Sequence, residues 1–197
     1  MTKLILASSS LGRKRLLDYL RLDYEIVSSD LDEDKIIGKT PVETIALRAK
    51  LKGEAVVENQ KIRKSNNLII LSADSDAILD DKVLGKPANR SEAVKLLASL
   101  SDRTHLFITA VHILKVDHNN SKTNKVIYSG ETKSYVTFRK ITRAEIEFYL
   151  NHTDFTRFAG RYSLISAQDF ITKVEGSLSN VIGLPLEVVI PILRKHL

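Results

Sequence analysis

Three consecutive serines followed by basic residues form the first candidate site in the chain. The stretch LILASSSLGRKRLL (4–17) places them after a short apolar run and at the start of an expected helix. Positive side chains are unfavourable at a helix N-terminus, where the macrodipole favours acids. A strand, a small polar turn and a helix N-terminus nevertheless form a common phosphate site, because backbone N–H groups face the anion. Ser8 and Arg13 are therefore candidates for phosphate binding, and a solvated basic face is the alternative.

Acidic residues in LSADSDAILDD (71–81) form the second candidate site. Asp74 and Asp76 follow four apolar residues, so we expect them where a buried strand ends. Carboxylates at the carboxyl end of a central strand can hold Mg²⁺ or accept a proton from water. Aspartate is also an ordinary turn former, so a structural role for Asp74 stays equally open. Asp80 and Asp81 are expected in a hairpin turn.

Other ionisable residues give weaker signals. The acidic run SDLDED (29–34) offers further oxygen ligands after another expected strand, and one of its acids is expected to face a cleft. Lys52 and Lys86 are single lysines, which on residue type alone are ordinary surface groups. The five histidines show no metal-ligand spacing, so we interpret them as structural or exposed.

Composition indicates a globular protein that does not enter a membrane. The 197 residues are 43% hydrophobic and 27% charged, which excludes disordered and fibrous classes. No apolar stretch approaches the roughly 20 residues that cross a bilayer. Zero cysteines exclude disulfides and thiolate chemistry, and a cytoplasmic location is expected. The net charge of +6 favours anionic ligands or reflects surface lysines, while 6% aromatics without tryptophan argue against a nucleic-acid partner.

The expected elements alternate between strand and helix in the first half, and long strands dominate the middle. Capping signals support helices that begin after Thr40 and after Thr142, and Pro191 is expected to interrupt the last helix. The expected strands are 3–8, 24–28, a buried strand and a second strand within 68–87, 104–116 and 125–138. The expected helices are 11–20, 41–57, 91–99, 142–150 and 185–197. This order predicts a mixed-sheet α/β protein with two lobes around a cleft.

Several stretches, taken in order, resemble the Maf family of nucleotide pyrophosphatases over nearly the whole chain. They are LILASSSLGRKRLL, ALRAKLKGEA, LSADSDAILDDKVLGKPANRSEAVKLLASLSDRTHLFITAV, FRKITRAEIEFYL, FAGRYS and VEGSLSNVIGLPL. The resemblance implies one Maf-like domain over 1–197, similar in fold to the inosine-triphosphate pyrophosphatases. That fold is an elongated mixed β-sheet flanked by helices, with two lobes around a central cleft.

The resemblance also implies an activity and residue roles. Family members hydrolyse a nucleoside triphosphate to the monophosphate and pyrophosphate with a divalent metal, Mg²⁺ or Mn²⁺, and a homodimer is possible by analogy. Asp74 would accept the proton of the attacking water and would hold the metal together with Glu33. The substrate-binding residues would be Ser8, Arg13, Glu33, Lys52 and Lys86.

Three positions depart from the family branches and concern the choice of base. Gly12 stands where the dTTP/UTP branch has arginine and the 7-methyl-GTP branch a bulky aromatic residue. Ser75 replaces threonine or glutamine after the aspartate, and Ile165 replaces glutamine or glutamate, with Ser166 and Gln168 as alternatives for that position. A site without a hydrogen-bonding partner for a base edge rejects analogues weakly, so the preferred base is not predicted.

Two functions remain open on the sequence. The first is a metal-dependent nucleoside triphosphate pyrophosphatase that acts on a canonical or modified nucleotide. The alternative is a catalytically weakened nucleotide- or nucleic-acid-binding protein, in which the changed positions mark a changed role. Asp74 with its flanking Ala73 favours the enzyme.

Overall fold

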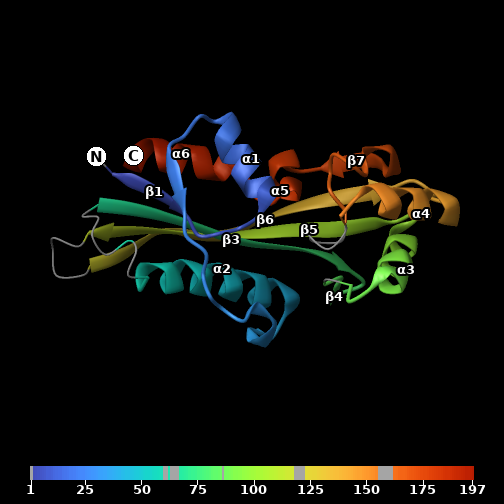
Figure 1. Cartoon of the computed structure of the whole chain (residues 1–197), viewed down its shortest axis with the longest axis horizontal. Helices are drawn as coiled ribbons and strands as arrows, with labels where there is room; N and C mark the ends of the chain where they lie inside the picture. Colours follow the sequence, from blue (N-terminus) through green and yellow to red (C-terminus); the bar gives the residue numbers. More distant parts are fainter. Residues whose placement is uncertain (1, 60–61, 63–66, 86, 118–122, 155–161) are drawn as a thin grey trace.

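The computed structural model describes residues 2–59, 62, 67–85, 87–117, 123–154 and 162–197. Within these residues, seven strands form one mixed sheet along an elongated molecule, with β1 and the end of α6 at the same end (Figure 1). The strand order is β2-β1-β3-β5-β6-β7, and β4 pairs with β3. The predicted fold class, an elongated mixed sheet flanked by helices, is confirmed.

Three long antiparallel strands are the centre of the sheet. β1 runs parallel to both of its neighbours, β2 and β3, whereas the other pairs are antiparallel. The strand bounds are β1 (Lys3–Leu6), β2 (Tyr24–Ile26), β3 (Asn67–Leu79), β4 (Lys82–Val83), β5 (Thr104–Asp117), β6 (Thr123–Phe138) and β7 (Ile171–Glu175). The region expected as a strand or a bent pair at 125–138 is thus one strand, and a register shift opposite Ile113/Leu114 bends it.

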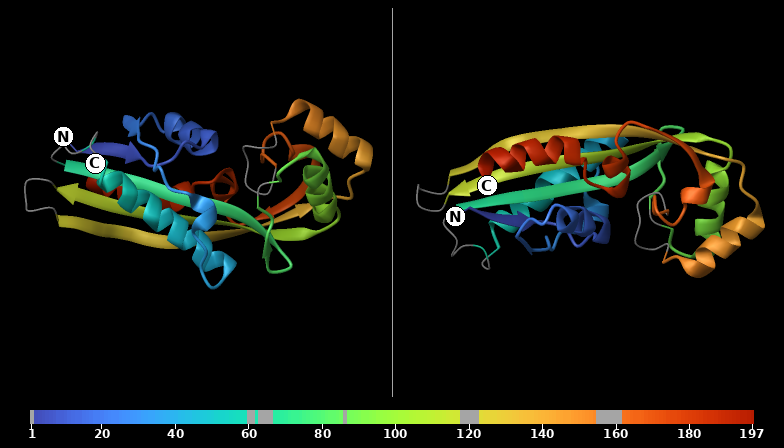
Figure 2. Two further views of the ribbon diagram at one scale, coloured as in Figure 1. Left: turned by 60° about the horizontal axis from the view of Figure 1, so that its bottom comes forward. Right: turned by 90° about the horizontal axis from the view of Figure 1, so that it is seen from above.

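Helices cover both faces of the sheet. α2 lies on one face and α1, α5 and α6 on the other, while α3 and α4 gather at the far end (Figures 1 and 2). The helix bounds are α1 (Leu11–Tyr19), α2 (Pro41–Val57), α3 (Arg90–Leu100), α4 (Arg143–His152), α5 (Leu178–Ile182) and α6 (Leu186–His196). Two short 3₁₀ helices are η1 (Glu33–Lys35) and η4 (Gln168–Phe170).

Alternation along β3 divides its side chains between the two helical layers. Leu68 and Ile70 belong to the apolar cluster that contains Val56 of α2. Ile69 and Leu71 belong to the cluster on the opposite face, with residues of α1 and α6. Burial on both faces explains why the first half of the strand is an unbroken apolar run. The same alternation sends residue 74 to the α2 side and residue 75 to the α1 side.

The expectation that a strand ends before Asp74 is wrong. β3 continues to Leu79 because β5 pairs with it from Asn67 to Ile78, with Asp74 opposite Ala110, and β4 pairs with its last residues. What ends near this point is β1, whose pairing with β3 stops at Leu71, so no described strand flanks residues 72–76 on that side. The end of the apolar run at Leu71 therefore coincides with the end of the neighbouring strand β1 and not with the end of β3. The turn that follows is at Asp80–Asp81, as predicted, and both residues have positive φ, 50° and 59°.

The capping predictions hold in part. Thr142 and Glu145 form the expected capping box of α4. Thr40 accepts a hydrogen bond from the Glu43 backbone N–H, but the Glu43 carboxylate accepts from the backbone N–H of Lys39, one residue earlier than in a capping box. Ser10 occupies the N-cap position of α1 without a side-chain cap bond.

The expectation that Pro191 interrupts the last helix is also wrong, because α6 runs continuously from Leu186 to His196. Proline removes the donor that would bond the carbonyl of Glu187, four residues earlier. Both residues are exposed, so water can satisfy this carbonyl.

The close packing of α2 on the sheet depends on Gly53. A Cβ at this position would lie 2.7 Å from Ser72 Oγ. Ser72 Oγ itself lies 2.7 Å from the carbonyl oxygen of Ala49 and 3.0 Å from that of His112. This hydroxyl therefore joins α2 to β3 and β5, and it cannot move aside without losing both contacts.

His105 is the basis of a prediction about acid stability. Its ring lies in the apolar cluster of Phe138 and Tyr162, with Nε2 2.8 Å from the Tyr162 hydroxyl, and burial lowers its pKa from 6.5 to about 4. Below pH 6.5 the His105 ring binds a proton in the unfolded state but stays neutral in the folded state. This contribution to stability is complete above pH 6.5 and is lost as the pH falls towards 4, with a loss of about 2 kcal/mol between pH 7.5 and pH 5. Urea unfolding at both pH values should show that His105→Gln weakens the pH dependence by that amount; an unchanged dependence contradicts the assignment.

Gly53→Ala should lower the free energy of unfolding by about 1–2 kcal/mol, because overpacking against Ser72 exceeds the gain in helix propensity. Urea unfolding measures the change. In a Ser72→Ala background the same substitution should be neutral or stabilising, since the contacting atom is gone. Equal losses in both backgrounds would show that the contact does not limit the packing.

Candidate active site

Arg13 is the buried member of the basic cluster at the start of α1. It is 7% exposed, whereas Lys14 and Arg15 are exposed. Its guanidinium donates from Nε to the Gly183 carbonyl, from Nη1 to Ser8 Oγ and from Nη2 to Ser75 Oγ, each at 2.9 Å. The loop after β1, strand β3 and the end of α5 therefore hold this one side chain.

The three acceptors around Arg13 are all neutral. Burial lowers the pKa of Arg13, and the negative charges of Asp74 and Glu33 oppose this effect. A guanidinium stays protonated under such conditions. The three bonds occupy three of its five N–H donors, so a fixed, buried positive charge keeps donors for an anionic ligand.

Lys52 forms the second centre of the site, on the α2 side of β3. Its Nζ lies 2.7 Å from Asp74 Oδ1 and 2.7 Å from Glu33 Oε2. The side chains of Lys52 and Asp74 are 7% and 10% exposed, and that of Glu33 is 41% exposed. A buried ammonium is costly unless it is paired, and here α2, β3 and η1 each supply one member of the pairing.

The two centres meet where β1 ends and β3 continues. Arg13 and Ser75 lie on the α1 side of β3, and Lys52 and Asp74 lie on the α2 side. With Glu33 the charged groups number four, two cations and two carboxylates. This arrangement joins a carboxylate that can accept a proton to cations that can bind phosphate oxygens. Ser8, Arg13, Glu33, Lys52 and Asp74, all predicted site residues, are thus brought together.

The positions that concern base choice have different surroundings. Gly12 packs against α5, since a Cβ there would lie 2.6 Å from the Ile182 carbonyl oxygen. Ser75 contacts Arg13 through its hydroxyl. Ile165 is 65% exposed in the segment before η4. Lys86 lies outside the described residues, so its predicted role stays a prediction.

Sequence reasoning missed three residues of the site. Gly183 has φ 116° at the C-cap of α5 and supplies the carbonyl that holds Arg13. A glycine between an apolar run and Leu-Pro is a helix-end signal that could have identified it. Thr109 contacts both Ser75 and the Asn180 carbonyl, and Thr109 and Asn180 lie in or near apolar runs. A polar residue inside the run FITAV was the available signal.

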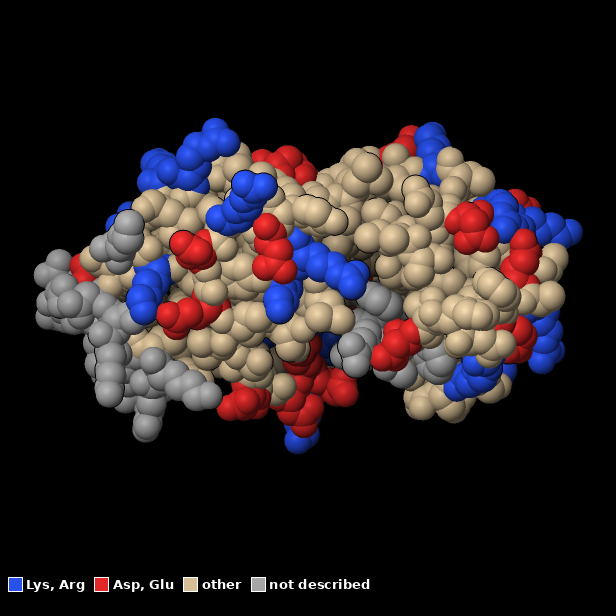
Figure 3. All heavy atoms as spheres, turned by 45° about the horizontal axis from the view of Figure 1, so that its top comes forward, with Lys and Arg blue, Asp and Glu red and all other residues tan. Residues whose placement is uncertain are grey.

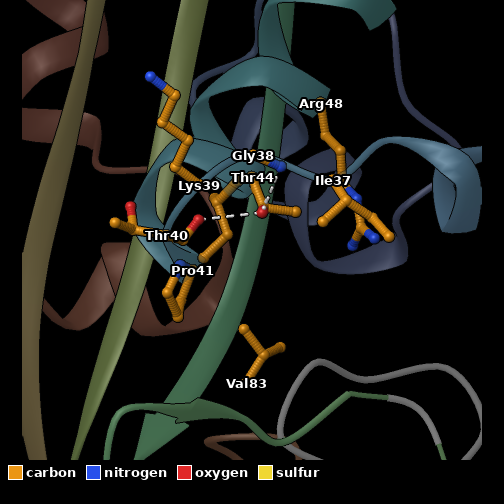
Figure 4. Close-up of a pocket in the computed structure, with 9 residues that line it drawn as sticks. Ile37, Gly38, Lys39, Thr40, Pro41, Thr44, Arg48 and Val83 are labelled. Carbon is orange, nitrogen blue, oxygen red and sulfur yellow. Dashed lines mark hydrogen bonds between the residues drawn. The ribbon is translucent and has the colours of Figure 1, made fainter.

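A pocket of about 320 Å³ lies at the start of α2, and the charged groups of the site are not among its lining residues. The loop before α2, the first turns of α2 and Val83 of β4 surround it (Figure 4). Its lining residues are Ile37, Gly38, Lys39, Thr40, Pro41, Thr44, Ile45, Arg48 and Val83. The geometry of the charged groups, and not this pocket, therefore defines the candidate site.

The residues that the structure describes contain neither a metal-binding cluster nor a membrane-spanning helix. No group of three or more histidine, aspartate or glutamate side chains there is arranged to hold a metal ion. None of the helices in the same residues is long and apolar enough to cross a membrane.

A protein-family model described as "Maf-like protein" matches residues 3–196. The chain belongs to this family. The resemblance noted in the sequence is thereby confirmed over nearly the whole chain.

Similar proteins agree with the family and with the fold. A protein of Cupriavidus pinatubonensis named dTTP/UTP pyrophosphatase is 33% identical, over 98% of this chain and 96% of its own length. One of Bacillus mycoides with the same name is 34% identical, over 94% and 91%. A solved HAM1 protein from Coxiella burnetii has a TM-score of 0.50 at 16% identity, covering 99% of this chain and all of that one, so it supports the fold alone.

Lys52→Met should lower the free energy of unfolding by about 3 kcal/mol, because it leaves the Asp74 carboxylate buried without its partner. Chemical unfolding measures the loss. Lys50→Met is the matched control, since Lys50 is an exposed α2 residue 3.9 Å from Glu54 and should change stability little. The double variant Lys52→Met/Asp74→Asn should recover at least half of the loss, and purely additive losses would contradict the buried pairing.

Proposed function

We propose that this Maf-like protein is a nucleoside triphosphate pyrophosphatase, which hydrolyses its substrate to the nucleoside monophosphate and pyrophosphate. The observation that carries the proposal is the position of Asp74. This buried carboxylate contacts Lys52 Nζ at 2.7 Å and shares a strand with Ser75, the residue that contacts Arg13. Relatives that match over more than nine tenths of both chains are named dTTP/UTP pyrophosphatase, which supports the same reaction.

The substrates to test first are dTTP and UTP, after the names of these relatives. Gly12 is a reason to include other bases, because the contact with Ile182 leaves no room for a side chain at that position. Any selection among bases by a side chain at position 12 is therefore absent from this protein. We therefore include purine and modified triphosphates in the substrate range to be measured.

Four residues are proposed to bind the triphosphate. Arg13 offers its remaining N–H donors, and Ser8 lies beside it at 2.9 Å. Lys52 supplies an ammonium next to the reacting carboxylate, and Lys86 is included through the family resemblance alone. Arginine suits this role because its planar fork matches phosphate oxygens in a bidentate geometry.

The residues present fit a divalent metal that arrives with the nucleotide. Asp74 and Glu33 both contact the same ammonium, so their carboxylates face a common point. Mg²⁺ is usually held by one or two carboxylates together with substrate phosphates and water, and such a site needs no larger cluster of protein ligands. When bound, the metal would neutralise phosphate oxygens and the departing pyrophosphate.

The reaction requires an attack by water on the α-phosphorus. The new bond joins the water oxygen to this phosphorus, and the bond to the bridging oxygen breaks, so that pyrophosphate leaves with the electron pair. Asp74 accepts the proton from the attacking water, and Lys52 fixes the carboxylate in place. Arg13 stabilises the negative charge that develops on the phosphate oxygens.

The alternative, a weakened nucleotide- or nucleic-acid-binding protein, has less support. On the face drawn in Figure 3, basic and acidic side chains are interspersed instead of forming one basic field. A continuous basic surface is what backbone binding of nucleic acids requires. A homodimer and a cytoplasmic location complete the proposal, by analogy with the family and from the sequence composition.

Asp74→Asn should reduce pyrophosphate release from dTTP or UTP with Mg²⁺ or Mn²⁺ by about 100-fold or more, the range of general-base catalysis. Asp80→Asn is the matched control, because Asp80 lies in the exposed β3–β4 turn and asparagine accepts its positive φ of 50°. Initial rates at saturating substrate measure the effect. Full activity of Asp74→Asn, or no turnover of any triphosphate by the parent protein, would contradict the proposed function.

A further inference from the structure

A line of hydrogen-bonding groups extends from Arg13 into the sheet. Arg13 Nη2 donates to Ser75 Oγ at 2.9 Å, and Ser75 Oγ lies 2.9 Å from Thr109 Oγ1 on the neighbouring strand β5. Thr109 Oγ1 in turn donates to the backbone carbonyl of Asn180 at 3.0 Å. Thr109 and Asn180 are fully buried. The one proton of the Thr109 hydroxyl can go to Ser75 Oγ or to the Asn180 carbonyl, and the Ser75 hydroxyl also lies 3.5 Å from the Gly183 carbonyl. Each hydroxyl is thus held between two fixed partners.

Asn180 fixes the second support of Arg13. Its Nδ2 donates to Ser134 Oγ of β6 at 2.8 Å and to the Phe107 carbonyl of β5 at 3.2 Å. These bonds attach the short helix α5 to the sheet. Gly183 is the C-cap of α5, and its carbonyl accepts from Arg13 Nε at 2.9 Å. Asn180 therefore supports Arg13 along two routes, through Thr109 and through Gly183.

We propose that Thr109 and Asn180 are positioning residues that fix the Arg13 guanidinium for a triphosphate, acting through Ser75 and Gly183. The proposal rests on the proposed function, in which Arg13 binds phosphate. It also assigns Ser75 a role in orienting Arg13, in place of the role in base choice that the family resemblance implies. Thr109 and Asn180 touch no substrate in this scheme.

Arg13 needs positioning residues because the groups that contact it are neutral. An arginine paired with a carboxylate is oriented by that ion pair, but its charge is then partly neutralised. Here neutral oxygens orient the guanidinium, so no carboxylate that holds it in place neutralises its charge. Neutral acceptors hold a side chain less firmly than a carboxylate does, and they must themselves be fixed. Pre-organised donors of this kind need little rearrangement when charge develops.

The first test compares affinities for inorganic tripolyphosphate, which carries the charge of the substrate but no base. Thr109→Val should weaken binding about fivefold to tenfold by calorimetric titration, with and without Mg²⁺, since a supporting hydrogen bond is lost. Thr109→Ser should recover most of this loss. Thr104→Val is the matched control: it removes a hydroxyl from the same strand, where Thr104 Oγ1 lies 2.8 Å from Thr137 Oγ1 in an exposed pair. Equal effects of the two valine variants overturn the proposal.

A double-mutant cycle separates positioning from a general structural effect. In an Arg13→Ala background, Thr109→Val should change tripolyphosphate affinity less than twofold, because the group on which Thr109 acts is gone. A loss as large as in the parent background overturns the proposal. Unfolding measurements on the same variants show whether any loss of affinity merely follows lost stability.

Base dependence distinguishes the two roles of Ser75. If Ser75 orients Arg13, Ser75→Ala weakens tripolyphosphate binding and lowers kcat/KM for dTTP, UTP and purine triphosphates by similar factors. A changed preference among bases with unchanged tripolyphosphate affinity assigns Ser75 to base choice and overturns the proposal. If the parent protein hydrolyses no triphosphate, the proposed function fails while the tripolyphosphate affinities still decide the positioning role. If the parent protein does not bind tripolyphosphate, the positioning role is overturned too.

Discussion

The buried ammonium of Lys52 is the interaction on which the geometry of the site depends. A positive charge this far from water needs anionic partners at contact distance, and Asp74 and Glu33 supply them at 2.7 Å. The pairing brings three segments from distant parts of the chain to one point. α2 must lie close against the sheet for Lys52 to reach β3, which is possible because Gly53 presents no side chain to Ser72. The contact between Lys52 and Asp74 therefore depends on the close packing of α2 against the sheet.

Arg13, on the other face of β3, is held in the opposite way to Lys52. It has no carboxylate in contact among the residues described, and neutral oxygens from three segments hold it. The protein therefore keeps one cation engaged with carboxylates and another available to an anion. In the proposed mechanism, the first arrangement secures the proton acceptor, and the second provides a fixed point for phosphate. A single cluster of mixed charges would have neutralised both.

How far the sequence could predict this site depended on the kind of interaction. The mixed α/β fold followed from alternating periodicities. The family motifs named Ser8, Arg13, Glu33, Lys52 and Asp74, which the structure places close together, while their roles stay predictions. Residue type alone described Lys52 as a surface group, because the partners of a buried lysine come from segments that periodicity cannot align. Asp74 was expected at a strand end, since an apolar run shows where apolar packing on both faces stops and not where burial or strand pairing stops. Thr109 and Asn180 were missed because their role lies in contacts between three elements.

The division of the site between the two faces of β3 limits how its gene can change. Neighbouring residues on a strand face opposite ways, so Asp74 and Ser75 reach their separate partners only in the present register. Loss or gain of one codon between Leu71 and Asp74 would exchange the faces and aim the carboxylate towards Arg13. The arginine would then be neutralised, and Lys52 would lose its buried partner. Changes of length in this protein are therefore tolerable in its turns but not in this short stretch of β3.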